Sequence, residues 1–121
     1  MNYDSTNPFA KILAGDLTCE LIYSDEFCIS FRSIEPKAKV HGLVIPRGQY
    51  IDFNDFALRA GSIEQVAMNN AIINTAKALG VFDSGYRLIY NCGKNSGQTV
   101  FHLHCHILAA EVLSDNLDGN F

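Results

Sequence analysis

Residues 101–108 read Phe-His-Leu-His-Cys-His-Ile-Leu and hold three of the four histidines in the chain. His102, His104 and His106 alternate strictly with apolar side chains. Successive side chains of a β-strand point to opposite faces, and residues two apart are separated by roughly 6.5–7 Å. The spacing therefore predicts a strand with three imidazoles on one face. Each neutral imidazole needs partners for a donor and an acceptor, so a polar strand face without a function is the less favoured interpretation.

Metal binding is one functional interpretation of these histidines. Two neighbours could share a zinc ion, but the outer pair would lie roughly 13 Å apart, too far for Zn–N bonds of about 2 Å. A third protein ligand would have to be His41, a cysteine or a carboxylate. The sequence contains neither a Cys-x-x-Cys pair nor a His-Glu-x-x-His helix motif. We therefore expect neither a metal nor a cofactor in the site.

Phosphorus chemistry is the other interpretation, and the preceding segment favours it. Residues 91–99 are small, polar and glycine-containing, as in a loop whose backbone approaches a ligand closely. Backbone N–H groups there, with the Gln98 amide and the Thr99 hydroxyl, would form a concave set of donors for phosphate oxygens. Because this loop runs directly into the histidines, the sequence predicts an anion site beside a nucleophile.

These motifs resemble the histidine triad (HIT) superfamily, whose signature is His-φ-His-φ-His-φ-φ with φ apolar. Residues 97–108 resemble that signature. Residues 7–15 resemble the opening helix of the family, residues 40–46 its His-φ-φ-φ-Ile-Pro strand, and Gly85-Tyr86-Arg87 with Asn91 the segment before the phosphate loop. The resemblance spans about residues 7–110 in the family's order and points to the Hint-like, bacterial-type branch.

The resemblance implies a role for each histidine. His104 would be the nucleophile, because the middle position has that role in the family. His106 would contact the phosphate and assist proton delivery to the leaving group, and His102 would support the site together with His41. The implied phosphate contacts are Asn91, Gly97, Gln98 and Thr99.

An apolar nucleoside pocket is also implied by the resemblance, formed by Phe9, Ile12, Leu17, Phe31, Ser33 and Ile34. Without the family, the five apolar members would be assigned to the core. Ser33 departs from the family pattern, which usually has Asp at this position. A carboxylate can accept hydrogen bonds from both ribose hydroxyls, whereas serine offers a weaker, shorter contact.

Composition is that of a small globular protein. The chain has 121 residues, a formal net charge of −4 and 48% hydrophobic residues. We expect one domain, residues 1–110, and a C-terminal tail, residues 111–121. The N-terminus does not resemble a leader and the sequence has no long apolar stretch, so we expect neither export nor membrane insertion. The four scattered cysteines predict reduced thiols in a cytoplasmic protein. The negative charge disfavours nucleic-acid binding.

The remaining pattern predicts an α+β fold. Asn7 and Gly15 bound a short helix at residues 8–14, and a capping box at Ser62–Gln65 begins a long helix over residues 62–79. The long helix is expected to turn inward Ile63, Val66, Ala67, Ile73, Ala76 and Leu79. Residues 19–23, 27–31, 42–46, 87–91 and 101–109 would form an antiparallel sheet of about five strands, with both helices on the face away from the histidines.

The sequence thus predicts a homodimeric, metal-independent nucleotide hydrolase or transferase. Open sheet edges and the small residues Ala67, Ala71 and Ala76 on the long helix indicate the dimer. Its substrates would be purine nucleoside phosphoramidates or adenylates, cleaved through a covalent nucleotidyl-histidine. Hydrolysis of dinucleoside polyphosphates is the alternative enzymatic activity, and a non-catalytic nucleotide-binding regulatory protein is the alternative outside catalysis.

Overall fold

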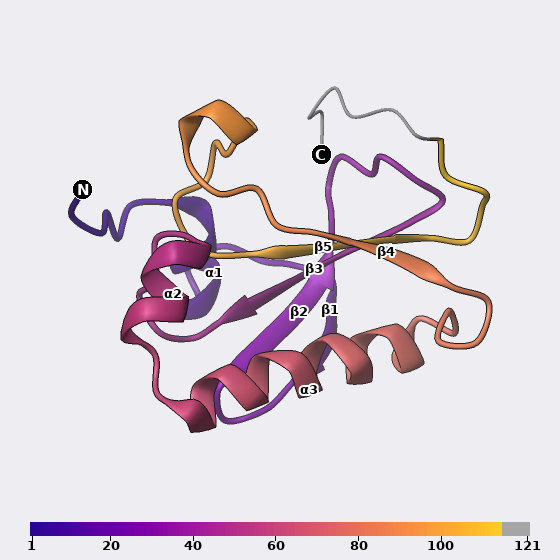
Figure 1. Ribbon diagram of the computed structural model, residues 1–121, viewed down its shortest axis with the longest axis horizontal. Coiled ribbons are helices and arrows are strands. Elements are labelled where there is room, and N and C mark those ends of the chain that lie inside the picture. The colour runs from indigo at the N-terminus through magenta and orange to yellow at the C-terminus, as the bar shows by residue number, and fades with distance from the viewer. Residues whose placement is uncertain (115–121) are drawn as a thin grey trace.

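The computed structural model describes residues 1–114 and shows the predicted α+β fold. One antiparallel sheet has the strand order β1-β2-β3-β5-β4. Figure 1 shows this sheet lying along the long helix α3 (Ser62–Ala78). The strands are β1 (Leu21–Ser24), β2 (Cys28–Arg32), β3 (Val40–Pro46), β4 (Tyr86–Ile89) and β5 (Cys105–Ala109).

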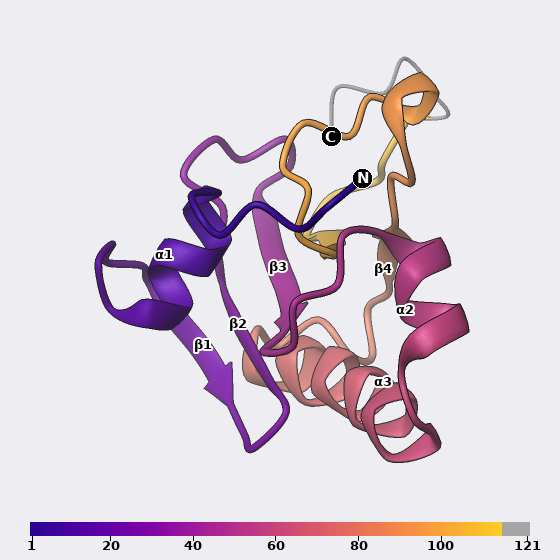
Figure 2. The ribbon, with the colours of Figure 1, turned by 90° about the vertical axis from the view of Figure 1, so that its left-hand side faces the viewer.

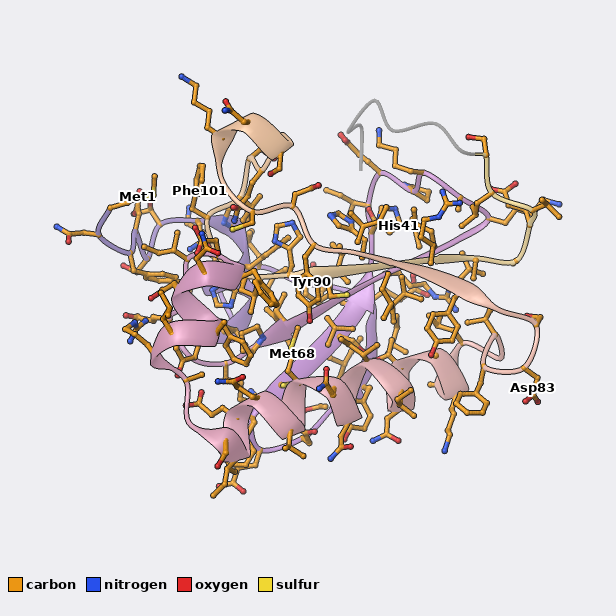
Figure 3. All side chains as sticks on the ribbon, in the orientation of Figure 1. Met1, His41, Met68, Asp83, Tyr90 and Phe101 are labelled. Atoms are coloured by element: carbon orange, nitrogen blue, oxygen red, sulfur yellow. The ribbon has the colours of Figure 1, made fainter. Side chains whose placement is uncertain are left out.

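The main core lies between α3 and the sheet, where Met68 meets residues such as Val44, Cys105 and Ile107 (Figure 3). The predicted inward face of α3 is largely wrong, since Ile63 and Val66 are 69% and 58% exposed and Ile73 is also exposed. Of the residues predicted to face inward, Ala76 is buried, and Ala67 and Leu79 are half-buried. The helix is rotated because polar Thr75 faces inward, where its hydroxyl donates to the Ala71 carbonyl and is hydrogen-bonded to the Ser30 hydroxyl. The buried residues of α3 are Met68, Ala71, Ile72, Thr75 and Ala76.

The predicted capping box at the start of α3 is also wrong. Gly61 is the N-cap residue, no side chain caps the helix, and Ser62 is already helical. Gln65 turns instead toward the preceding segment, where its amide donates to the carbonyls of Ala57 and Ala60. The cause is a helix that was not predicted, which ends at Arg59 with Ala60 as its C-cap, directly before Gly61.

This unpredicted helix is α2 (Phe53–Arg59). Asp52 caps it by accepting a hydrogen bond from the Asp55 N–H at 2.8 Å. Its inward residue, Phe56, packs edge-on against the Tyr50 ring with the ring centroids 5.0 Å apart. The Asp-Phe-Asn-Asp start is a signal that the sequence did contain, because Asp at the N-cap and an acid in the first turn favour helix initiation.

Helix α1 (Pro8–Ala14) has the predicted bounds, with Asn7 as N-cap and Gly15 ending it in the left-handed conformation at φ 82°. Its place relative to the sheet was predicted incorrectly. Phe9 of α1 packs with Ile29, Phe31, Leu43 and Ile45, on the face opposite α3, and Figure 2 shows the two helices on either side of the strands. Phe9 also contacts the histidines, so α1 covers their face.

The histidine segment is only partly strand. β5 begins at Cys105, so His106 lies within it while His102 and His104 lie in the segment that leads into it. Residues 110–114 carry neither helix nor strand, and the rest of the predicted tail, residues 115–121, lies outside the described residues. Cys19, Cys28, Cys92 and Cys105 are all free thiols. Within residues 1–114, no helix has the length and apolarity needed to cross a bilayer.

Candidate active site

Four buried histidines gather on the α1 face of the sheet. β3 supplies His41, which is paired in register with Leu108, and β5 supplies His106, paired with Leu43. The two histidines are therefore diagonal neighbours on one face. Figure 3 shows His41 on the side of the sheet away from α3. The His106 and His104 ring centroids lie 5.0 Å apart, closer than two positions along a regular strand, because His104 precedes β5.

His104 is held so that one ring nitrogen remains free to react. Its Nδ1 lies 2.7 Å from the carbonyl oxygen of His102, which can only accept. Nδ1 therefore carries the proton, and the Nε2 of a neutral ring carries a lone pair. Burial lowers the pKa of His104 below its ordinary value, and the hydrogen bond to the His102 carbonyl raises the pKa by a smaller amount. A neutral imidazole with its Nε2 lone pair available is the state that a nucleophile requires.

His41 fixes the tautomer of His106. The Lys37 backbone N–H donates to His41 Nδ1 at 3.0 Å, so the proton of His41 is on Nε2. This Nε2–H donates to His106 Nδ1 at 2.9 Å and leaves the His106 proton on Nε2. Among the described residues, His106 Nε2 is the one buried side-chain nitrogen or oxygen without a hydrogen-bond partner. A buried donor without a protein partner costs free energy, as expected of a group that binds a ligand atom.

Burial keeps His41 and His106 uncharged. It is the main cause of a pKa of about 4 for His41, with smaller effects of Lys37 and His104. For His106, burial followed by the neighbouring His104 and His41 lowers the pKa to about 3. Both rings are therefore neutral near pH 7, which agrees with the tautomers assigned from their partners.

His102 supports the site in a way that differs from the expected pairing with His41. His41 contacts His106, whereas His102 Nε2 donates to the Pro46 carbonyl at 2.8 Å. The other ring nitrogen of His102, Nδ1, is bonded to the hydroxyl of Tyr3. Burial lowers the pKa of His102 to about 4, partly opposed by the bond to Pro46. The side chain of His102 is thus fully engaged, and its carbonyl orients His104.

The candidate phosphate loop contains a short 3-10 helix, η1 (Lys94–Ser96), followed by Gly97 at φ 91°. Gln98 is buried and holds the loop together. Its Oε1 accepts from the Gly93 N–H, and its Nε2 donates to the carbonyls of Ile51 and Val100. Its side-chain donors are therefore occupied, which differs from their expected use on phosphate. Thr99 is exposed and Asn91 is half-buried.

The expected nucleoside pocket divides into buried and exposed members. Phe9 is buried, and its ring lies edge-on to those of Phe31 and His104 at centroid distances of 5.4 and 5.0 Å. Ile12 packs beside them, half-buried. Leu17 and Ile34 are 44% and 96% exposed, which contradicts their assignment to the core. Exposed apolar side chains are available to cover a ligand, so the pocket assignment remains a proposal for these two.

Two features of the site were missed in the sequence. Backbone carbonyls of Pro46 and His102 select ring tautomers, and a hydroxyl from the N-terminal segment, that of Tyr3, reaches His102. No sequence pattern signals Pro46 or Tyr3 as partners of His102, because both contacts depend on how distant segments pack, whereas the His102 carbonyl lies two residues from His104 and depends on the local backbone before β5. Within residues 1–114, no group of three or more histidine, cysteine or acidic side chains is arranged to hold a metal ion.

Comparison with known proteins finds the HIT domain over residues 14–112. An uncharacterised HIT-like protein of Azospirillum brasilense is 40% identical over 92% of this chain and 91% of its own length. The purine nucleoside phosphoramidase of Escherichia coli K12 is 32% identical over 90% of this chain and 91% of its own. The structure of a HIT family hydrolase from Clostridium thermocellum superposes with a TM-score of 0.85 at 34% identity, covering 93% of this chain and 97% of that one.

Proposed function

The chain belongs to the HIT domain family, and from this membership and the histidine geometry we propose that it is a nucleotide-binding hydrolase or transferase. Its substrates are purine nucleoside phosphoramidates or adenylates, and it acts through a covalent nucleotidyl-His104 intermediate. One observation carries the proposal. The His102 carbonyl fixes the Nδ1 proton of His104, so the Nε2 lone pair is available beside the unpaired Nε2–H of His106. A neutral nucleophile beside a donor suits attack on an anionic phosphorus centre.

In the first step His104 Nε2 attacks phosphorus, and the bond from phosphorus to the leaving nitrogen or oxygen breaks. The leaving group gains one proton, which we assign to His106 Nε2. His106 then carries a negative charge until its proton is returned, and the cationic nucleotidyl-His104 ring beside it, with the two ring centroids 5.0 Å apart, offsets that charge. The bond from His104 Nδ1–H to the His102 carbonyl strengthens as that positive charge develops.

In the second step water attacks phosphorus, the bond to His104 breaks and the nucleotide is released. The water returns one proton to His106, so the cycle restores both rings. The phosphate contacts in this proposal come from the loop at Asn91, Gly97 and Thr99, with Gln98 holding the loop in shape. Phe9, Ile12 and Phe31, with Leu17, Ser33 and Ile34 at the rim, receive the nucleoside.

The reaction can be tested with a substrate panel assayed in EDTA. We expect turnover of adenosine phosphoramidates or acyl-adenylates to exceed that of dinucleoside polyphosphates, and acid-quenched protein to carry one nucleotidyl group on His104 by mass spectrometry. Preference for dinucleoside polyphosphates would support the alternative hydrolase. Tight AMP binding without turnover of any of these substrates would support the non-catalytic regulatory protein, and activity lost in EDTA would contradict metal independence. A cytoplasmic location remains a prediction.

The pH dependence of kcat/KM follows from the lowered pKa of His104. A ring with a lowered pKa stays neutral to lower pH, so activity should hold as pH falls from 8 and decline only below the ordinary histidine value of about 6.5. The measurement uses a substrate whose own groups do not titrate in this range. An acid limb centred above that value would show that His104 is protonated more easily than its burial implies.

Ribose recognition should be weak, because Ser33 replaces a carboxylate that could accept from both hydroxyls. The Ser33 hydroxyl already accepts from the Glu35 N–H at 3.2 Å. We expect the wild type to bind AMP and 2′-deoxy-AMP about equally, and Ser33→Asp to favour AMP by about 1–3 kcal/mol. Isothermal titration of both nucleotides against both proteins measures this, with Ser33→Ala as the control. A strong ribose preference in the wild type would show that another residue recognises the diol.

We further propose that the protein is a homodimer whose sheets join edge to edge. β1 and β4 are the edge strands of the sheet. Ala71 and Ala76 cannot contact a partner helix, because both are fully buried within the protomer. The outward face of α3 instead presents Ile63 and Val66 beside Phe27, around one surface hollow. Exposed apolar side chains grouped in this way are typical of protein interfaces.

Light scattering at micromolar concentration should give twice the 13.4 kDa chain mass, in the presence of EDTA as well. Val66→Lys should give monomers, because it places a charge within the apolar face. Leu58→Lys is the matched control, since Leu58 is 86% exposed on α2 and does not line that hollow. Equal masses for Val66→Lys and the wild type would place the interface elsewhere.

A further inference from the structure

The N-terminal segment contributes a side chain to the histidine site. The Tyr3 hydroxyl lies 2.5 Å from His102 Nδ1, and the two rings meet edge to face with their centroids 5.6 Å apart. The Nε2 proton of His102 is committed to the Pro46 carbonyl, so Nδ1 of the neutral ring is an acceptor. The tyrosine hydroxyl is therefore the donor in this contact.

Tyr3 is itself held by the residue that begins α1. Asn7 Nδ2 donates to the Tyr3 hydroxyl oxygen at 3.0 Å, and Asn7 Oδ1 accepts from the N–H groups of Phe9 and Ala10. The hydroxyl oxygen thus accepts a hydrogen bond from Asn7 while its own proton points to His102. One asparagine fixes both the start of α1 and the direction of the Tyr3 hydrogen bond, and Phe9 on the same helix packs against His104.

We propose that Tyr3 is a positioning residue for His104 that acts through His102. The inference rests on the proposed function, in which His104 Nε2 attacks phosphorus. With Tyr3 on one ring nitrogen and Pro46 on the other, the His102 side chain is fixed at both ends. The same residue carries the carbonyl that accepts the His104 Nδ1 proton. Fixing His102 therefore fixes the direction in which the His104 lone pair points.

The test is Tyr3→Phe in the full chain, which removes the hydroxyl and keeps the ring. We expect kcat to fall about tenfold with KM within about twofold, because a small misalignment affects the attack and not the binding of nucleotide. In a His102→Gln background, Tyr3→Phe should cause no further loss, since its effect is transmitted by the His102 ring. Tyr50→Phe is the matched control, because it loses a phenolic hydrogen bond of 2.7 Å to Glu64 outside the site.

A second measurement does not depend on turnover. In long-range ¹H–¹⁵N spectra of the imidazoles, the His102 Nδ1 signal should move in Tyr3→Phe and stay in place in Tyr50→Phe. The role of Tyr3 would be overturned if the His102 Nδ1 signal did not move in Tyr3→Phe. It would also be overturned if Tyr3→Phe left the kcat of an active enzyme unchanged, or if the losses in kcat from Tyr3→Phe and His102→Gln were fully additive. A wild type that turns over none of the substrates would overturn the proposed function, while the spectra would still show whether Tyr3 holds His102.

Discussion

Asparagine in place of His104 should abolish turnover while AMP still binds with an affinity close to that of the wild type. The side chain supplies the only bond to phosphorus that the proposed mechanism makes with the protein. Its loss should lower kcat by at least about 10⁴-fold, as for other enzymes whose nucleophile is removed. Stopped-time assays with an adenosine phosphoramidate and isothermal titration with AMP measure the two quantities separately.

His106→Asn provides the matched comparison for that variant. It removes the unpaired Nε2–H and leaves the nucleophile, so we expect a loss of about 10²–10³-fold with the nucleotidyl adduct still detectable. The His104 variant should show no adduct at any time point. Turnover by His104→Asn within about tenfold of the wild type would exclude covalent catalysis by this residue.

His41→Phe should also cause a large loss, about 10²-fold in kcat, although His41 makes no bond to phosphorus in the mechanism. The variant keeps a ring of similar size but cannot donate to His106 Nδ1, a bond of 2.9 Å in the wild type. His106 would then be free to carry its proton on Nδ1, which points away from the substrate. Single-turnover assays should show slower formation of the adduct with little change in nucleotide affinity.

Two variants separate this explanation from a loss of packing. His41→Gln keeps an N–H that can reach His106 Nδ1, so it should recover a substantial part of the activity. Lys37→Ala should leave kcat nearly unchanged, because Lys37 reaches His41 through its backbone N–H, which the substitution retains. If His41→Phe and His41→Gln lose activity equally, the tautomer of His106 is not what His41 controls.

Local signals in the sequence predicted several elements correctly. The Asn7 cap and the terminal Gly15 bound α1 as expected, because caps and left-handed glycines depend on neighbouring residues alone. The inward face of α3 was mispredicted, because Thr75 is buried by its bond to Ser30, 45 residues away in the chain. Hydropathy alone assigns such a threonine outward and the exposed Ile63 inward.

The candidate site divides in the same way. The spacing of His102, His104 and His106 determined by itself that three imidazoles would gather, and with the glycine-containing loop it predicted a phosphorus substrate, which stays a proposal. The tertiary structure alone decided where the protons of the His102 and His106 rings lie. That choice depends on partners 99, 65 and 56 residues away, namely Tyr3 for His102, His41 for His106 and the Pro46 carbonyl for His102. A ring nitrogen takes its proton state from the atom it faces, and folding determines that atom.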